Sequence, residues 1–225
     1  MSCSSMATEA RGPSSEHPCY SAHGQHQYAR IHLAVAPACN IQCNYCNRRY
    51  DCSNESRPGV TSMVLTPQQA AARVASVAQR LPNLKVVGIA GPGDPLANAS
   101  RTLETLKRVK EIDPELLLCV STNGLTLAEH APALAAVGVH HLTITINTLD
   151  AATAARIYAW VYRGQRRWQG LAGARELLAA QLDGLRAAVA HGMQVKINSV
   201  VIRGHNDDQV LPLTRWAMAE AVPLR

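Results

Sequence analysis

Short apolar runs alternate along the chain with longer segments in which apolar residues recur at helical spacing. The runs are bounded by Pro, Gly or polar clusters, which is typical of buried strands. They predict strands at residues 31–37, 85–90, 116–120, 142–147 and 194–202. The segments between them predict helices at 66–81, 99–112, 127–137, 151–161, 172–191 and 207–221, the third interrupted near Pro132.

Strands that alternate with helices predict parallel β-α units joined by right-handed crossovers. About five such units in a row predict an α/β fold, a partial parallel (β/α) barrel. Residues 222–224 read as the beginning of a sixth strand that is not continued, so the sixth strand is expected to be missing. Residues 1–16 are polar and Ser-rich, which predicts a disordered leader. One core domain, incomplete at its C-terminus, is then expected over residues 17–225.

Polar segments follow each predicted strand, at residues 39–52, 91–95, 121–124, 147–150 and 198–199. The carboxyl ends of parallel strands meet at one edge of the sheet, and ligands bind there in such folds. The pattern therefore predicts one ligand site built from these five segments.

Three cysteines, Cys39, Cys43 and Cys46, follow the first predicted strand with the spacing C-x3-C-x2-C. Three thiolates on one short loop hold three corners of a four-iron cluster and leave one iron open. A structural zinc site normally closes with four ligands, and a disulfide framework needs paired cysteines in an oxidising compartment. The triplet favours a cluster with one vacant coordination position. A zinc loop and reduced core thiols are the alternatives.

The composition adds limits on partners and location. A chain of 225 residues is long enough for one sizeable core. The net charge of +6 is modest, and basic residues are scattered apart from residues 163–167, so nucleic-acid binding is not inferred. Neither a secretory signal nor an apolar run long enough to span a membrane is present. A cytoplasmic protein with reduced thiols and no membrane partner is expected.

The cysteine triplet after a first strand resembles the radical S-adenosylmethionine (SAM) superfamily. Longer stretches narrow the resemblance to the family of nitrogenase cofactor maturases. They lie at residues 17–21, 36–48, 51–60, 91–96, 121–124 and 196–200. The resemblance extends from about residue 17 to about residue 213 and implies a barrel of the radical SAM type.

The resemblance implies an enzyme of nitrogenase cofactor biosynthesis. In that family two [4Fe-4S] clusters are fused, with a SAM-derived carbide, into the eight-iron precursor of the iron–molybdenum cofactor. One SAM donates a methyl group to a cluster sulfide. A second SAM is cleaved reductively to a 5′-deoxyadenosyl radical, which abstracts hydrogen from that methyl group. The implied partners are SAM, iron–sulfur cluster donor and cofactor-carrier proteins, and a reducing electron donor.

The resemblance also assigns roles to the cysteines and to one acid. Cys39, Cys43 and Cys46 would hold the SAM-binding [4Fe-4S] cluster, with the methionine amino and carboxylate groups on the open iron. The ligands of an additional substrate cluster would be Cys52, Cys119 and Cys19. Without the resemblance, Cys119 reads first as a buried strand thiol. Glu55 would be catalytic, binding SAM or relaying protons; its alternative is a solvated acid paired with Arg57.

Short polar residues at the strand ends complete the implied SAM site. Gly91 would let backbone carbonyls approach the methionine ammonium, and Asp94 would add an acceptor for it. The ribose, adenine or carboxylate of SAM would meet Ser121, Thr122, Asn123, Asn147, Asn198 and Ser199. Any one of these residues alone is equally well explained as a helix cap.

The family continues beyond this sequence with a sixth strand and a C-x2-C segment that supplies ligands for the second substrate cluster. Two other functions therefore remain open. One is a truncated, non-catalytic carrier of iron–sulfur clusters. The other is a different radical SAM activity on a peptide or small molecule, which the set Cys19, Cys52 and Cys119 disfavours.

Overall fold

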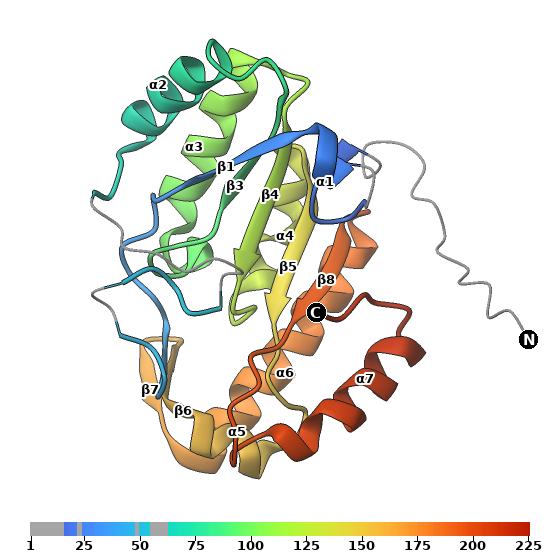
Figure 1. Ribbon diagram of the computed structural model, residues 1–225. Coiled ribbons are helices and arrows are strands. Elements are labelled where there is room, and N and C mark those ends of the chain that lie inside the picture. Colours follow the sequence, from blue (N-terminus) through green and yellow to red (C-terminus); the bar gives the residue numbers. More distant parts are fainter. Residues whose placement is uncertain (1–15, 22–23, 48–49, 55–62) are drawn as a thin grey trace, which may run out of the picture.

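The computed structural model describes residues 16–21, 24–47, 50–54 and 63–225. Five strands form one sheet in the order β1-β3-β4-β5-β8, and all four neighbouring pairs are parallel (Figure 1). The strands are β1 (Ala29–Leu33), β3 (Leu84–Ile89), β4 (Leu117–Thr122), β5 (Val139–Thr145) and β8 (Gln194–Asn198). The predicted α/β fold with five parallel strands is confirmed. In the described residues the sheet does not close into a barrel.

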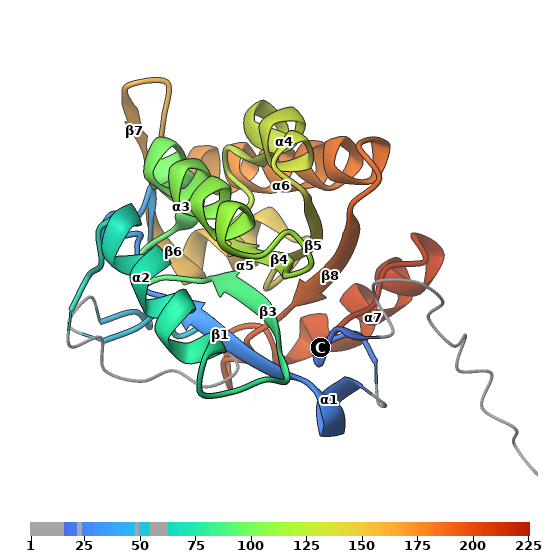
Figure 2. The same ribbon diagram turned by 90° about the horizontal axis from the view of Figure 1, so that it is seen from above.

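Four helices cover the outer face of the sheet (Figure 2). They are α2 (Pro67–Ala78), α3 (Ala99–Ile112), α4 (Leu127–Ala136) and α6 (Gly170–Ala190). α2 packs on α3, and α4 packs on α6. Thr66 caps α2 through a capping box with Gln69, as the pair Thr66-Pro67 predicts. Pro132 lies inside α4, which continues through it rather than being interrupted.

The main core lies between the sheet and these helices. Alternate strand residues point to opposite faces, and the outward set packs against the helices. It includes Val87, Leu118, Val120, Leu142, Ile144 and Ile197, all nearly inaccessible to solvent. The inward set is polar, with Cys119 and Ser121 on β4 and Lys196 on β8. Burial of one apolar face thus leaves the other face free to carry chemistry.

The largest departure from the sequence prediction lies at residues 158–168. The predicted helix at 151–161 is α5 (Ala151–Ile157) only, and β6 (Tyr158–Arg163) follows it directly. β6 pairs antiparallel with β7 (Arg166–Trp168), and on its other side with β2 (Ile41–Cys43), inside the cysteine segment. Gly164 and Gln165 both have positive φ, 58° and 62°, as the two-residue hairpin turn of this handedness requires.

The remaining elements lie near the two ends of the described chain. α1 (Gly24–Gln27) precedes β1, and the 3-10 helix η2 (Pro95–Asn98) precedes α3. η3 (Asp207–Gln209) and α7 (Val210–Ala219) replace the single helix predicted at 207–221. The predicted leader at 1–16 lies outside the described residues except for Glu16, whose carboxylate pairs with Lys85 at 3.0 Å.

Residues 223–225 lie beside β8. The N–H of Ile197 donates to the carbonyl of Pro223 at 2.8 Å, and the N–H of Arg225 donates to the carbonyl of Ile197 at 3.0 Å. Leu224 thereby forms a parallel bridge with Ile197. The segment predicted as the beginning of a sixth strand therefore occupies the sixth-strand position. Among the described helices, none has the length and apolar character needed to cross a membrane.

Candidate functional site

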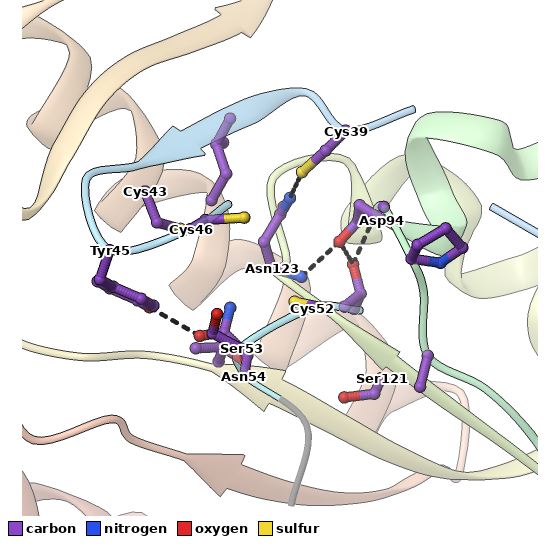
Figure 3. Close-up of a pocket in the computed structure, with 16 residues that line it drawn as sticks. Cys39, Cys43, Tyr45, Cys46, Cys52, Ser53, Asn54, Asp94, Ser121 and Asn123 are labelled. Carbon is purple, nitrogen blue, oxygen red and sulfur yellow. Dashed lines mark hydrogen bonds between the residues drawn. The ribbon is translucent and has the colours of Figure 1, made fainter. Parts of the chain in front are cut away.

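A pocket opens at the carboxyl ends of β3, β4 and β5, where the polar segments were predicted to meet. It is partly open to solvent. Four cysteines line it together: Cys39, Cys43, Cys46 and Cys52 (Figure 3). Residues near the cysteines, after β3 and at the end of β4 complete the wall: Ile41, Tyr45, Ser53, Asn54, Ala90, residues 92–94, residues 121–123 and Thr145. Three of the five predicted polar segments therefore contribute directly to one pocket.

The cysteine triplet is held by strand pairing. Cys43 ends β2 and pairs with Tyr158 of β6, and the N–H of Asn44 donates to the carbonyl of Ile157 at 2.8 Å. Cys43 is buried, and burial raises the pKa of its thiol. Cys39 accepts a hydrogen bond from the side-chain amide of Asn123 at 3.7 Å. The thiols thus stand on a fixed backbone.

Cys52 joins the triplet at the pocket rather than standing apart from it. Burial raises the pKa of its thiol, a hydrogen bond from the Asn54 backbone lowers it in part, and the charges of Cys39, Asp94 and Cys46 raise it, which together bring it to about 12. Gly91 lies against it, since a Cβ at Gly91 would stand 3.6 Å from the Cβ of Cys52. Gly91 also has a φ of 153°, in a region that favours glycine.

The donor set suits an iron–sulfur cluster. Thiolates are the ligands that such clusters use, and protonated thiols lose their protons when a metal centre binds. Among the described residues, no three His, Cys, Asp or Glu side chains are gathered closely enough to hold a single metal ion. The sulfurs stand around a pocket, as a polynuclear group with several corners requires.

Asp94 lines the pocket, but its carboxylate is already engaged by the chain. It accepts hydrogen bonds from the N–H groups of Leu96 at 2.8 Å and Ala97 at 3.3 Å, and from the N–H of Asn123 at 2.6 Å. The Thr122 hydroxyl donates to it at 2.9 Å. Burial raises the pKa of Asp94, and these hydrogen bonds lower it again in part. Asp94 therefore joins the end of β3 to the end of β4, which leaves it less free to accept from a ligand ammonium than the sequence suggests.

Gly93 allows the close approach on which this wall depends. A Cβ at Gly93 would stand 2.0 Å from the carbonyl oxygen of Ala38. Its N–H donates to the carbonyl of Ala36 at 2.5 Å, and the N–H of Asp94 donates to the carbonyl of Ala38 at 2.8 Å. The turn after β3 is thereby joined to the segment that leads into Cys39.

A second set of hydrogen bonds ties the Cys52 segment to the sheet. The Tyr45 hydroxyl donates to the Asn54 side chain at 2.7 Å and accepts from the Asn147 amide at 2.7 Å. The Asn198 amide donates to the carbonyl of Asn54 at 2.8 Å. Asn147 and Asn198 were predicted to contact SAM. They hold in place the segment that carries Cys52.

The other predicted site residues differ from one another in where they lie. Ser121, Thr122 and Asn123 line the pocket. Ser199 does not line it, and its N–H donates to the carbonyl of Arg225 at 2.9 Å. Glu55, predicted to be catalytic, lies outside the described residues.

Cys19 and Cys119 both lie near Tyr20 and Lys196, outside the pocket lining. Cys119 lies two residues before Ser121 on β4 and points to the same inner face of the sheet. Ser121 lines the pocket, and Cys119 lies just below it. The Lys196 ammonium donates to the carbonyl of Cys19 at 3.0 Å and stands 4.7 Å from the centre of the Tyr20 ring. Burial raises the pKa of Tyr20, and a thiolate at Cys119 or Cys19 raises it further.

Some residues that build the site were not singled out from the sequence. The Gln181 amide of α6 donates to the carbonyls of Asn123 and Thr145, both at 2.8 Å. The Asn206 amide donates to the carbonyl of Asn147 at 2.8 Å. The signal for Gln181 was a polar residue within the apolar stripe of α6, between Leu177 and Leu185. Asn206 gave no signal.

Comparison with known proteins supports the class of site that the geometry indicates. The model of the radical SAM superfamily matches residues 33–217. A structure described as native anSMEcpe with bound AdoMet and Cp18Cys peptide shares the fold, with a TM-score of 0.58 at 13% identity. It covers 87% of this chain and 49% of that one. The chain therefore belongs to the radical SAM superfamily, and that membership supports a [4Fe-4S] cluster and SAM as its cofactors.

Within the superfamily the chain is similar to proteins named FeMo cofactor biosynthesis protein NifB. It is 58% identical to that of Klebsiella pneumoniae over 199 residues, covering 88% of this chain and 42% of the relative. It is 48% identical to that of Azotobacter vinelandii over 217 residues, covering 96% and 43%. The chain spans less than half the length of these relatives, and the predicted resemblance to NifB is confirmed over that part.

Proposed function

We propose that the chain is the radical SAM part of an enzyme of FeMo cofactor biosynthesis. Its reaction would fuse two [4Fe-4S] clusters, with insertion of a SAM-derived carbide, into the eight-iron precursor. The observation that carries the proposal is the lining of one pocket by Cys39, Cys43 and Cys46. The identity of 48–58% with proteins named FeMo cofactor biosynthesis protein NifB supports a reaction of FeMo cofactor biosynthesis.

Cys39, Cys43 and Cys46 would hold the SAM-binding cluster at the pocket. When bound, that cluster supplies the electron that cleaves SAM reductively to a 5′-deoxyadenosyl radical. The backbone of residues 91–93 would receive the methionine end of SAM, on a wall that Asp94 keeps in place. Ser121 and the aromatic ring of Tyr45 would contact the remainder of the molecule.

Cys119 and Cys19 would hold a substrate cluster directly below SAM. Cys119 lies two residues before Ser121 on the same face of β4, so that the cluster would lie near the radical, with a methyl group on its sulfide within reach. Lys196 and Arg30 lie next to Cys19, and Arg30 donates a hydrogen bond to its sulfur. Two cations at this point favour binding of an anionic cluster.

Cys52 lines the same pocket as the triplet. Its role in holding the substrate cluster stays a prediction, as does the role of Glu55 in proton transfer. Iron–sulfur cluster donors, cofactor carriers and a reducing electron donor would be the partners of the whole enzyme. The second substrate cluster would need ligands beyond those assigned here.

The deciding experiment is anaerobic reconstitution of the chain and of two variants, Cys43→Ala and Cys119→Ala. Iron per chain, SAM affinity and 5′-deoxyadenosine are measured on each. We expect Cys119→Ala to lose roughly half of the bound iron and to keep SAM cleavage, because the two clusters have separate ligands. Cys43→Ala should lose SAM cleavage.

Three results would contradict the proposal. Zinc in place of iron would remove the radical chemistry altogether. An intact cluster that is indifferent to SAM would leave a cluster carrier as the function. Equal loss of iron and of SAM cleavage in both variants would remove the distinction between a SAM-binding cluster and a substrate cluster.

A further inference from the structure

The hairpin formed by β6 and β7, residues 158–168, covers the outside of the cysteine segment. β6 pairs with β2 on one edge, so that Gln42 faces Trp160 and Ile41 faces Val161. The N–H of Tyr162 donates to the carbonyl of Asn40 at 2.7 Å. No other strand of the described chain is hydrogen-bonded to β2.

The two faces of this hairpin differ. Val161 and Trp168 pack into a small core with Ile41 and Leu177. The opposite face carries Trp160, Tyr162 and Arg167, because alternate residues point to opposite sides of a strand. Tyr162 is 48% exposed.

The hairpin also carries two arginines whose charge is not balanced. Arg163 forms ion pairs with Glu129 at 3.3 Å and Glu176 at 2.9 Å. Arg166 and Arg167 are exposed, and no carboxylate of the described residues lies within ion-pair distance of either.

Aromatic rings fix the position of both guanidinium groups. That of Arg166 lies 4.0 Å from the centre of the Trp168 ring, and that of Arg167 lies 5.2 Å from the centre of the Trp160 ring. Stacking holds the charges on the surface without neutralising them. Trp, Tyr and Arg are also the residues that contribute most to protein–protein binding energy.

We propose that this basic hairpin is the docking surface for a small acidic electron-carrier protein. The inference rests on the proposed function, which needs an electron at the cluster for every SAM that is cleaved. Electron transfer weakens steeply with distance, and the hairpin is the surface joined directly to the strand that carries Cys43. Arg167 shares one face of the hairpin with Trp160 and the exposed Tyr162, and Arg166 is exposed on the other face, beside the turn. These two charges, neither of them in an ion pair, complement an acidic partner, and redox partners of this kind use small, charge-steered interfaces.

The test uses reduced flavodoxin, an acidic flavin protein, as the probe on the anaerobically reconstituted chain. Stopped-flow absorbance gives the second-order rate of cluster reduction by flavodoxin, and dithionite serves as a chemical reductant that needs no docking. Calorimetry with oxidised flavodoxin gives its affinity independently of any turnover. The variants are Arg166→Glu with Arg167→Glu, and Arg166→Lys with Arg167→Lys. The matched control reverses two exposed charges elsewhere, Arg186→Glu with Arg215→Glu.

We expect the Glu variant of the hairpin to lower the flavodoxin rate and affinity about tenfold or more at low salt. The loss should shrink in 0.5 M salt, where charge is screened within about 3–5 Å. Reduction by dithionite should be unchanged, and the Lys variant and the control pair should stay within about twofold of the parent chain.

Equal flavodoxin rates and affinities in the hairpin variant and the control pair would overturn the proposal. So would an equal loss with flavodoxin and dithionite, which would assign the arginines to the structure of the cluster loop. Loss of binding to a labelled single-stranded oligonucleotide with flavodoxin unaffected would make the surface a nucleic-acid site. A chain that binds flavodoxin but cleaves no SAM with dithionite would refute the proposed function and leave the docking surface standing.

Discussion

Replacement of Asp94 by alanine tests whether this carboxylate stabilises the pocket wall or binds a ligand. The side chain is 4% exposed and accepts hydrogen bonds from three backbone N–H groups and from the Thr122 hydroxyl. Alanine leaves the three N–H groups without an acceptor. At roughly 1–2 kcal/mol for each unsatisfied donor, the expected loss of unfolding free energy is about 3–6 kcal/mol. That is a large share of the 5–15 kcal/mol typical of a domain.

Urea unfolding of the cluster-free chain, followed by circular dichroism, measures this loss. With a slope of about 2 kcal/mol per molar, the midpoint should fall by roughly 1.5–3 M. Asp94→Asn keeps one acceptor oxygen and should lose about 1–3 kcal/mol, so it remains measurable if the alanine variant does not fold. Asp150→Ala is the control, because Asp150 caps α5 through one hydrogen bond to the N–H of Thr153 and should lose only about 1 kcal/mol.

The reasoning is refuted if Asp94→Ala unfolds within about 0.5 kcal/mol of the parent chain. If SAM affinity of the reconstituted protein then fell about tenfold, which corresponds to 1.4 kcal/mol, the carboxylate would be a ligand contact, as the sequence suggested. The two roles are therefore separated by measuring stability without a cluster and affinity with one.

Three further outcomes are expected. Gly93→Ala should lose at least about 3 kcal/mol in the same urea assay, because its Cβ would stand 2.0 Å from the backbone oxygen of Ala38; a loss below about 1 kcal/mol would contradict this. Gly184→Ala should lose roughly 1 kcal/mol, since contact at 2.8 Å with the Leu127 Cβ outweighs the gain of about 1 kcal/mol in helix propensity. Burial lowers the pKa of His141 from 6.5 to about 4, so the folded protein holds it neutral and the unfolded chain binds the extra proton below pH 6.5. Stability should therefore fall by about 2 kcal/mol between pH 7 and pH 5 through this residue, and His141→Gln should remove that part of the slope.

Local patterns predicted the parts of the fold that depend on neighbouring residues. The helix at 99–112 begins and ends where the structure has α3, because its apolar stripe and its flanking Asn98 and Asp113 are local features. Residues 158–161 were assigned wrongly to a helix. Their strand partner, β2, lies more than 100 residues earlier, and no local pattern reveals a pairing at that separation.

The candidate site, like the fold, could be predicted only in part from the sequence. Cysteine spacing and resemblance selected residues that do line the pocket, such as Cys39 and Cys46. Hydrogen bonds within the wall were beyond prediction, because whether Asp94 or Asn198 meets the chain or a ligand depends on distances that only the folded backbone sets. Gln181 reaches the site from the buried face of α6, where the sequence indicates packing against the core.

The pairing of β2 with β6 has a consequence for the assembly of the metal centre. The backbone of Ile41–Cys43 is held by its pairing with β6, that is, by the chain itself. The conformational entropy of that segment, about 1–2 kcal/mol per residue, is lost during folding and not at the moment of cluster assembly. A chain that has lost its iron to oxygen would accordingly keep the backbone conformation of this segment and be able to bind a new cluster.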